Sequence, residues 1–363
     1  MKIISVVGAR PNFMKVAPLI KEMEQHSQIQ HLLVHTGQHY DTRMSDSFFS
    51  DLQIPAPDIH LNVGSDTHAR QVAKIMTSFE EVCLEQQPDF LIVVGDVNST
   101  MACSLVAAKL DTQIIHVEAG IRSHDRKMPE EINRLVTDSI AHYLLTPSED
   151  ASQNLRQEGH SENQISMVGN IMIDTLLKFQ DQIKGSPILE QLNLAPQEYV
   201  SLTLHRPSNI DVLQNFSQIL EALDYIQQHI KIIFPMHPRG KKMIEKFGLE
   251  NKIKQMKNLI LLEPLGYFDF GKLVANSKFV LTDSGGIQEE TTVYKIPCIT
   301  LRENTERPVT ITQGTNELAG SDTGKIINLA EMILDGKWKT GEIPPLWDGK
   351  AAGRIVDFIL NIK

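Results

Sequence analysis

The feature that most constrains this chain is a repeated alternation of short apolar runs with longer amphipathic segments. The runs are rich in Ile, Val and Leu, and each is followed by a polar loop and then by a helical pattern. Strands buried on both faces of a parallel sheet have this appearance, because helices cover the two faces. The alternation therefore predicts an α/β, doubly wound parallel-sheet fold.

The alternation runs through the chain twice. In the first half we expect strands at 3–7, 32–35, 90–94, 114–117, 143–146 and 165–168, and helices at 13–25, 68–87, 99–110 and 129–141. In the second half we expect strands at 199–204, 232–234, 259–262, 279–281 and 298–301. Residues 181–196, with Gly185, Pro187 and Pro196, predict a loose connection. A chain of 363 residues is also too long for one core.

We therefore expect two Rossmann-like domains, at 1–170 and 171–345. A final helix within 346–363 follows Pro344-Pro345 and is expected to pack back onto the first domain.

Charge and cysteine content exclude several classes of protein. The net charge of −10 and the pI of about 5.7 argue against a nucleic-acid binder. Three scattered cysteines, Cys83, Cys103 and Cys298, predict a reducing compartment without disulfides. The sequence has no CxxC pair, so it gives no indication of a zinc site. The apolar runs are too short to cross a membrane, and the first residues do not resemble a signal peptide. We expect a cytoplasmic enzyme without metal.

A Ser-Gly-Gly turn follows the apolar run at 279–281. Ser284 is expected to cap the next helix, while Gly285 and Gly286 allow a ligand close to the backbone. The first amides of a helix favour anions, so this turn suits a phosphate. An ordinary βα turn is the alternative, but Arg302 and Arg307 lie near in sequence and favour the phosphate.

Ligands of doubly wound sheets bind at the carboxyl ends of the strands. The polar residues expected at those ends are Arg10, His35, Asp96, Glu118, His205, His237 and Ser284. The loop after the first strand lacks GxGxxG, so it predicts no dinucleotide site. Arg10 and Lys15 instead suit a pyrophosphate, with solvated surface charge as the alternative.

Three carboxylates could carry chemistry. Asp96 and Glu118 each end an apolar strand, and crowded carboxylates can divide acid and base roles. Glu130 lies in a first helical turn, where a carboxylate can equally act as a cap. His205 and His237 could take part or could simply hydrogen-bond their turns.

Eleven motifs together resemble one family along essentially the full length of the chain. They are GARPNFMK (8–15), HTGQHYD (35–41), GDVNST (95–100), HVEAGIRS (116–123), MPEEINR (128–134), VGN (168–170), LHRPSN (204–209), MHPR (236–239), TDSGGIQEE (282–290), RENTERP (302–308) and WDGKAAGRI (347–355). With these motifs the chain resembles the non-hydrolysing UDP-N-acetylglucosamine 2-epimerases.

The resemblance implies a GT-B fold, in which two Rossmann-like domains face a cleft. It also implies interconversion of UDP-GlcNAc and UDP-ManNAc for surface polysaccharide precursors, without a cofactor, in a homodimer. By motif match, the catalytic residues are Asp96, Glu118, Glu130 and His205. The residues implied to bind the nucleotide-sugar are Arg10, Lys15, Phe270, Ser284, Gly285, Gly286, Glu290 and Arg307. The resemblance does not decide which carboxylate takes the proton.

Some bacterial members of this family bind a second UDP-GlcNAc as an activator. The matching residues here are Gln38, Arg206 and His237. Pro207 stands where many members have Arg, and the interval from Glu118 to Glu130 is shorter than usual, so the chain departs from the family pattern there. Residues 265–266, Leu-Gly, also replace a polar pair in the loop near the uracil.

Four alternative functions remain. An epimerase of a UDP-2,3-diacetamido uronic acid would need an extra cation near the sugar carboxylate. A hydrolysing epimerase would release free ManNAc. A GT-B glycosyltransferase would need an acceptor and would not exchange deuterium into C2. A non-catalytic binder would show no turnover.

Overall fold

The computed structural model describes residues 1–37 and 55–362 of the chain. It divides into two compact units: unit 1 comprises Met1–Lys178 and Pro345–Lys363, and unit 2 comprises Phe179–Pro344. None of the helices in the described ranges is both long and apolar enough to cross a membrane.

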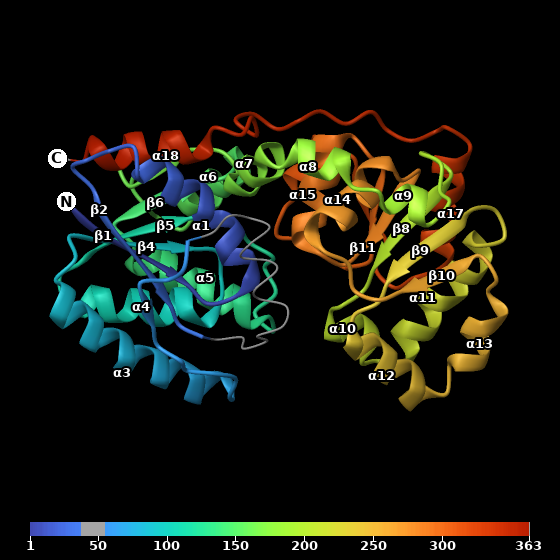
Figure 1. The fold of residues 1–363 in the computed structure, drawn as a ribbon, viewed down its shortest axis with the longest axis horizontal. Helices are drawn as coiled ribbons and strands as arrows, with labels where there is room; N and C mark the ends of the chain where they lie inside the picture. Colours follow the sequence, from blue (N-terminus) through green and yellow to red (C-terminus); the bar gives the residue numbers. More distant parts are fainter. Residues whose placement is uncertain (38–54, 363) are drawn as a thin grey trace. The chain divides into compact units, whose positions relative to one another are not determined.

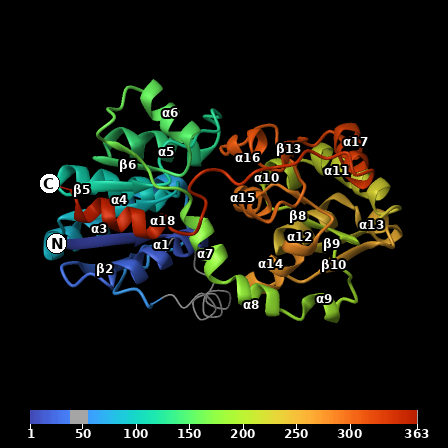
Figure 2. The same cartoon turned by 90° about the horizontal axis from the view of Figure 1, so that it is seen from above.

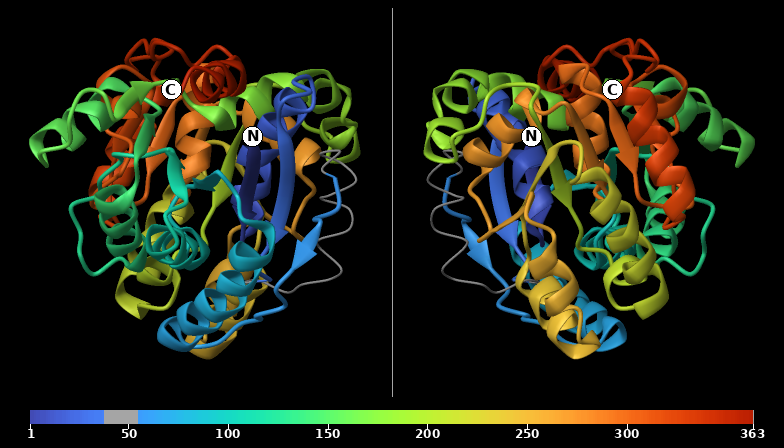
Figure 3. Two further views of the ribbon diagram at one scale, coloured as in Figure 1. Left: turned by 90° about the vertical axis from the view of Figure 1, so that its left-hand side faces the viewer. Right: turned by 90° about the vertical axis from the view of Figure 1, so that its right-hand side faces the viewer.

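Unit 1 is built on a seven-stranded parallel sheet (Figure 1). Its strands are β1 (Lys2–Val7), β2 (Gln30–His35), β3 (Ile59–His60), β4 (Phe90–Val94), β5 (Gln113–Val117), β6 (Tyr143–Thr146) and β7 (Ile165–Met167). Their order is β3-β2-β1-β4-β5-β6-β7, so the winding reverses between β1 and β4. At such a reversal the neighbouring loops separate, which is where these sheets bind ligands. The paired strands β1 and β2 run side by side in Figure 3.

Helices cover both faces of this sheet. They are α1 (Arg10–Met23), α3 (His68–Gln86), α4 (Asn98–Lys109), α5 (Pro129–Ile140), α6 (Glu149–Gln157), α7 (Ile171–Lys178) and α18 (Ala351–Leu360). Helices α3, α4 and α5 lie on one face, and α1, α7 and α18 lie on the other (Figures 1 and 2). The core between the sheet and α3 and α4 includes Ile4, Leu91, Phe79 and Cys103, which are all fully buried.

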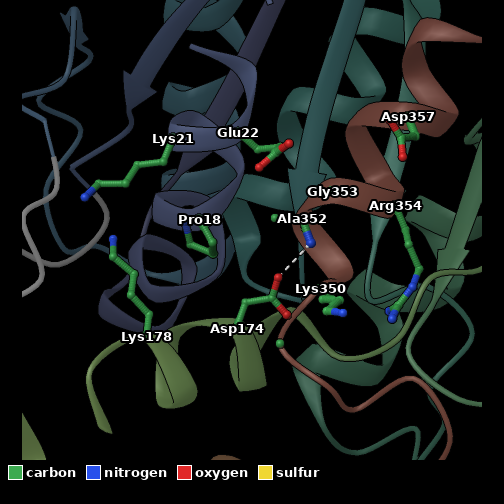
Figure 4. A pocket seen from close by; sticks show the side chains of 11 residues that line it. Pro18, Lys21, Glu22, Asp174, Lys178, Lys350, Ala352, Gly353, Arg354 and Asp357 are labelled. Carbon is green, nitrogen blue, oxygen red and sulfur yellow. Dashed lines mark hydrogen bonds between the residues drawn. The ribbon is translucent and has the colours of Figure 1, made fainter. Parts of the chain in front are cut away.

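Helix α18 belongs to unit 1 although unit 2 precedes it in the sequence. Asp174 of α7 caps it by accepting hydrogen bonds from the amides of Ala351 and Ala352, at 3.1 and 2.8 Å (Figure 4). Just before the helix, the Trp347 indole donates to the carbonyl of Pro147 at 3.0 Å. The cap and the indole bond fix the entry of α18, and its apolar face then packs on α1 and α7.

Unit 2 is built on a six-stranded parallel sheet. Its strands are β8 (Tyr199–Thr203), β9 (Lys231–Pro235), β10 (Leu259–Leu262), β11 (Phe279–Thr282), β12 (Cys298–Thr300) and β13 (Asn316–Leu318). Their order is β10-β9-β8-β11-β12-β13, so this sheet reverses its winding between β8 and β11. The predicted fold class of two doubly wound parallel sheets is therefore confirmed.

The helices of unit 2 also form two layers. They are α8 (Gln180–Gly185), α9 (Ile188–Gln191), α10 (Pro207–Ile210), α11 (Leu213–Ile226), α12 (Pro238–Phe247), α13 (Glu250–Gln255), α14 (Tyr267–Asn276), α15 (Gly285–Tyr294), α16 (Val309–Thr312) and α17 (Thr323–Leu334). Helices α11 and α17 pack together on one face of the sheet, and α8, α9 and α15 pack with α14 on the other.

Three local expectations were wrong or incomplete. The connection at 181–196 is not loose, because α8 and α9 bury Ile183, Ile188 and Leu189 and pack on α14 of the same unit. The short strands β3 and β13 were not expected, since two or three residues carry no readable alternation. Ser284 occupies the N-cap position of α15, but its side chain makes no capping hydrogen bond.

Candidate active site

The first loop of unit 1 is tied to the strand beside it. The Asn12 side chain accepts from the amides of Gly8 and Ala9 at 3.3 and 3.0 Å and donates to the Val94 carbonyl at 2.9 Å. A Cβ at Gly8 would stand 2.1 Å from the hydroxyl oxygen of Ser99, so only glycine fits. The loop, which follows β1, is thus tied to the end of β4, and Arg10 begins α1 directly after it. The side chain of Arg10 lies outside the described part of the structure.

Lys15 and Glu118 form a buried ion pair in unit 1. Lys15 lies in α1, so the pair joins that helix to the end of β5. Gly95 lies against the pair, because a Cβ there would be 2.9 Å from Lys15 Nζ and 3.5 Å from Glu118 Oε2. Glu118 itself has φ of +72°. A bulky residue with positive φ is strained, and such strain is concentrated at functional sites.

Asp96 lies at the end of β4, the strand that pairs with β5. Its carboxylate accepts from Nε and Nη2 of Arg134 at 3.1 and 3.0 Å, and 24% of its side chain is exposed. Arg134 is buried and also pairs with Glu131, whose other oxygen accepts the His124 amide at 2.9 Å. Asp96 therefore keeps an accessible edge while a buried guanidinium fixes its orientation.

Glu130 is exposed in the first turn of α5, whereas its neighbour Glu131 is buried. Burial favours the neutral form of Glu131, but hydrogen bonds from Ser123 and the charge of Arg134 outweigh it and lower the pKa of this carboxyl. Glu131 is therefore a structural anion, and Glu130 is the carboxylate of this pair that can reach solvent.

In unit 2, Asp283 organises the loop that carries His205. The buried Asp283 carboxylate accepts from the amides of His205 and Arg206, from the Asn209 side chain at 3.1 Å, and from Nδ1 of His205 at 2.7 Å. Burial opposes the charge of Asp283, but His205 and the two amides outweigh burial and lower the pKa of this carboxyl. Nδ1 of His205 is thus occupied by Asp283, and the His205 side chain is 49% exposed.

Ser284, Gly285 and Gly286 follow β11 and begin α15, and all three are partly exposed. Arg307 packs directly on this turn, because a Cβ at Gly285 would be 2.6 Å from its Nη1. The guanidinium of Arg307 thus lies beside the first amides of α15, which have no partners inside the helix. This arrangement suits an anion.

Carboxylates behind the turn hold Arg307 in place. Its Nε contacts Glu289 at 2.6 Å and its Nη1 contacts Glu306 at 2.6 Å. Glu306 also pairs with Arg302 at 2.7 Å and lies 3.7 Å from Arg206. Burial opposes the charge of Glu306, but Arg307 and Arg302 outweigh it and hold the pKa of this carboxyl well below its usual range.

Glu290 is buried one residue further along α15. Burial, and then the charge of Glu289, raise the pKa of Glu290 to about 8. Burial and Glu290 in turn raise the pKa of the Tyr267 and Tyr294 hydroxyls. Among the described residues these two buried hydroxyls have no hydrogen-bond partner. Phe270 packs partly against the apolar cluster beside this helix.

The proposed activator residues are only partly described. His237 is the N-cap of α12, and its Nδ1 accepts from the Arg239 amide at 3.2 Å, which supports its structural role. Burial, and then the charges of His205 and Arg239, lower its pKa. Arg206 donates to the Asp283 carbonyl at 3.1 Å. Gln38 lies outside the described residues.

Several partner residues were not predicted from sequence, notably Asp283, Arg134 and Glu306. Asp283 follows an apolar strand directly, and Asp96 follows one after a single glycine, so the same strand-end rule could have selected Asp283. Arg134 and Glu306 carry no such signal, because their role depends on residues brought together by the fold.

Other parts of the described structure offer fewer candidates. No group of three His, Cys, Asp or Glu in the described ranges could hold a metal ion. A hollow of about 510 Å³ in unit 1 is lined by Pro18, Lys21, Glu22, Asp174, Lys178, Gly349, Lys350, Ala352, Gly353, Arg354 and Asp357 (Figure 4). None of these lining residues was predicted to belong to the site, and Asp174 is engaged as the cap of α18.

Comparisons with known proteins agree over most of the chain. The family model described as UDP-N-acetylglucosamine 2-epimerase matches residues 21–360. A UDP-N-acetylglucosamine 2-epimerase homolog of Methanococcus maripaludis is 46% identical, covering 90% of this chain and 91% of its own. The crystal structure of Methanocaldococcus jannaschii UDP-GlcNAc 2-epimerase in complex with UDP-GlcNAc and UDP is 42% identical, covers 99% of both chains, and superposes with a TM-score of 0.90. A UDP-2,3-diacetamido-2,3-dideoxy-D-glucuronate 2-epimerase of Pseudomonas aeruginosa is 37% identical and covers 100% of both chains.

Proposed function

This chain belongs to the UDP-N-acetylglucosamine 2-epimerase family, and from that premise we propose that it interconverts UDP-GlcNAc and UDP-ManNAc. The reaction inverts one carbon of the sugar and is therefore an isomerisation. The observation that carries the proposal is the chain-long similarity to a 2-epimerase crystallised with UDP-GlcNAc and UDP. The ends of β4 and β5 add two carboxylates, Asp96 and Glu118, on paired strands.

The chemistry of the substrate explains why such carboxylates are needed. The proton on C2 is not acidic while C1 is neutral. When the C1–O bond breaks, UDP leaves with the bonding pair and C1 gains cationic character. A base then takes the C2 proton, and its bonding electrons form the double bond of 2-acetamidoglucal. Return of a proton to the other face of C2 and re-addition of UDP to C1 complete the inversion without net hydrolysis.

Within unit 1, we assign Asp96, Glu118 and Glu130 to the reacting sugar. The Lys15–Glu118 pair is buried and the backbone of Glu118 is strained, so the position of the Glu118 carboxylate is tightly fixed. A tightly fixed carboxylate supports the assignment of Glu118 to the reacting sugar. Arg10 and Lys15 are assigned to the nucleotide-sugar, since cations stabilise a departing diphosphate. His205 of unit 2 is assigned to the same reaction, because its ring is held by Asp283 and still reaches solvent.

Within unit 2, we assign the UDP to the start of α15. Ser284, Gly285 and Gly286 would donate backbone amides to the diphosphate, and Arg307 beside them would add charge. Glu290 is assigned to the ribose hydroxyls, and Phe270 to the vicinity of the uracil. A ribose diol donates to an ionised carboxylate, so UDP should favour loss of the Glu290 proton.

The deciding experiment is incubation of the enzyme with UDP-GlcNAc in deuterated water, followed by NMR. We expect UDP-ManNAc to form and deuterium to appear at C2 of both sugars. Asp96→Asn and Glu118→Gln should abolish both signals while UDP binding stays within a few-fold. Product without deuterium at C2 would exclude the proposed elimination, and free ManNAc would indicate a hydrolysing enzyme instead.

The similarity to the Pseudomonas aeruginosa enzyme supports a second candidate substrate, a UDP-2,3-diacetamido uronic acid. Parallel assays with the two UDP-sugars distinguish the candidates through the ratio of their kcat/KM values. We expect UDP-GlcNAc to be preferred, and preference for the uronic acid would reassign the substrate.

We also propose that the enzyme is a homodimer located in the cytoplasm. The three cysteines, Cys83, Cys103 and Cys298, are buried free thiols, which supports a reducing compartment. Sedimentation equilibrium tests the dimer, since a monomer would have the chain mass of 40.8 kDa.

A further inference from the structure

A buried histidine lies two residues before Glu118 and has no role in the function proposed so far. His116 is in β5 and is 0% exposed. Its Nδ1 lies 2.6 Å from the carboxylate of Asp138 in α5, and its Nε2 lies 2.9 Å from the carbonyl oxygen of Gly95. The ring therefore connects α5 to the turn that carries Asp96.

The partners of the ring determine its protons. The Gly95 carbonyl only accepts, so Nε2 carries a proton. Asp138 accepts from the Gly120 amide at 3.1 Å and lies 2.6 Å from Nη2 of Arg122. Both of these groups donate to one oxygen of Asp138, and its other oxygen lies against Nδ1 of His116. The ring is therefore held at both of its nitrogens, by Gly95 and by Asp138.

The surrounding charges favour the ionised form of Asp138. Burial opposes the charge of Asp138, but His116 and Arg122 outweigh burial and lower the pKa of its carboxyl. Arg122 in turn pairs with Glu158 at the end of α6, at 2.6 Å.

The same residues hold the chain on both sides of Glu118. Asp138 holds the backbone at Gly120 and the ring at His116, two residues on either side of Glu118. Gly120 has φ of +78°, and a Cβ there would stand 2.3 Å from the Ala151 carbonyl oxygen. A strained residue such as Glu118 keeps its conformation only when its surroundings over-determine it. Asp138 and His116 supply that constraint.

We propose that His116 is a positioning residue of the epimerisation proposed above, whose ring fixes the Gly95–Asp96 turn relative to Glu118. His116 does not touch the sugar in this proposal, and it acts through the placement of the two carboxylates. Its loss should therefore slow proton transfer at C2 while leaving the affinity for the nucleotide unchanged. The proposal rests on the epimerase assignment for its kinetic part, whereas the cross-link made by the ring is independent of that assignment.

The kinetic test compares His116→Gln with wild type. We expect kcat to fall by about 100-fold, since small displacements of reacting groups have effects of this size. We expect the KM for UDP-GlcNAc and the Kd for UDP to stay within about threefold, and the isotope effect with C2-deuterated UDP-GlcNAc to increase. A purely structural role would lower the fraction of active enzyme without changing the isotope effect.

His142→Gln is the matched control in the same unit. Nδ1 of His142 accepts from the Ile114 amide at 3.0 Å, and the residue is exposed. We expect its kcat and isotope effect to match wild type. Asp138→Asn weakens the contact between Asp138 and Nδ1 of His116. We expect it to change kcat and the isotope effect as His116→Gln does, with KM and Kd again little changed. It also serves as the second variant if His116→Gln does not fold.

Nitrogen-15 NMR of histidine-labelled wild-type protein tests the ring directly. We expect a proton on Nε2 of His116, because this nitrogen lies 2.9 Å from the Gly95 carbonyl oxygen, which can only accept. An unprotonated Nε2 would overturn the cross-link between the ring and the Gly95–Asp96 turn. Wild-type kcat and isotope effect in His116→Gln would overturn the positioning role. A wild-type enzyme without epimerase activity would instead refute the proposed function, while the NMR result would still stand by itself.

Discussion

Buried carboxylates in this protein differ in what surrounds them. Glu118 is paired with Lys15, and Glu289 is paired with Arg307. Glu290 instead lies near the negative charge of Glu289, and burial is the main cause that raises its pKa to about 8. In the protein without ligand, Glu290 is therefore protonated at neutral pH. Hydroxyl groups that donate to the Glu290 carboxyl would favour its ionised form and hence the loss of this proton.

We expect Glu290 to make stability depend on pH. The folded protein keeps this proton up to about pH 8, whereas the unfolded chain loses it near 4.5. Stability should therefore decrease as pH rises through this interval and level off above it. Glu290→Gln should remove this decrease and gain roughly 2–4 kcal/mol at pH 9 relative to wild type. Urea denaturation between pH 5 and pH 9 measures the difference.

Glu245→Gln, at an exposed position in α12, serves as its control and should follow the wild-type curve. Parallel curves for Glu290→Gln and wild type would show that Glu290 is ionised in the folded protein throughout this range.

At the scale of single residues, the sequence indicated where charged groups would stand but not what they would bind. Asp96 and Glu118 were recognisable because each follows an apolar strand. The partner of Glu118 is Lys15, 103 positions earlier in the chain. No local pattern encodes such a pairing, because it depends on a helix and a strand end that meet only once the sheet has formed.

At the scale of elements, strands were predicted well because a fully buried strand is an uninterrupted apolar run. The strands β4, β6 and β10 have the expected bounds. The short helices α8 and α9 were missed, since Gly185 and the nearby prolines indicated a loop. Their burial against α14 is a tertiary effect that local sequence does not report.

The turn between β11 and α15 makes a prediction about glycine. A methyl group at Gly285 would displace Arg307, because its Cβ would be 2.6 Å from Nη1 and 3.0 Å from Glu306 Oε1. We expect Gly285→Ala to weaken UDP binding about tenfold, or about 1.4 kcal/mol, with little change in Tm. Isothermal titration calorimetry measures the affinity.

Gly324→Ala, in the first turn of α17, is the matched control and should bind UDP as wild type does. Gly286→Ala meets no atom within 4 Å, so a loss of affinity there would report direct approach of the ligand. If Gly285→Ala bound UDP as tightly as wild type, the assignment of the phosphate to this turn would be wrong.

At the scale of the whole molecule, unit 1 is assembled from two separate stretches of the chain. Residues 1–178 supply its sheet, and residues 345–363 supply α18, which packs on α1 and α7. The sequence indicated a final helix at this place from its pattern after Pro344-Pro345. Its cap by Asp174, 177 positions earlier, could not be foreseen.

We expect the apolar face of α18 to contribute strongly to the stability of unit 1. Ile355 is fully buried, so Ile355→Ala should lower the free energy of unfolding by about 2–4 kcal/mol. Asp357→Ala, on the exposed side of the same helix, should change it by less than about 0.5 kcal/mol. Guanidinium denaturation followed by circular dichroism measures both, and equal stability of the two variants would mean that α18 is dispensable.

The late position of α18 has a consequence for biosynthesis. Residues 179–344 leave the ribosome before this helix does, so unit 2 can fold while unit 1 still lacks its last layer. Until then the apolar surface of α1 and α7 stays open to water and to chaperones. Unit 1 therefore begins to be synthesised before unit 2 but can complete its fold only after unit 2 has been synthesised.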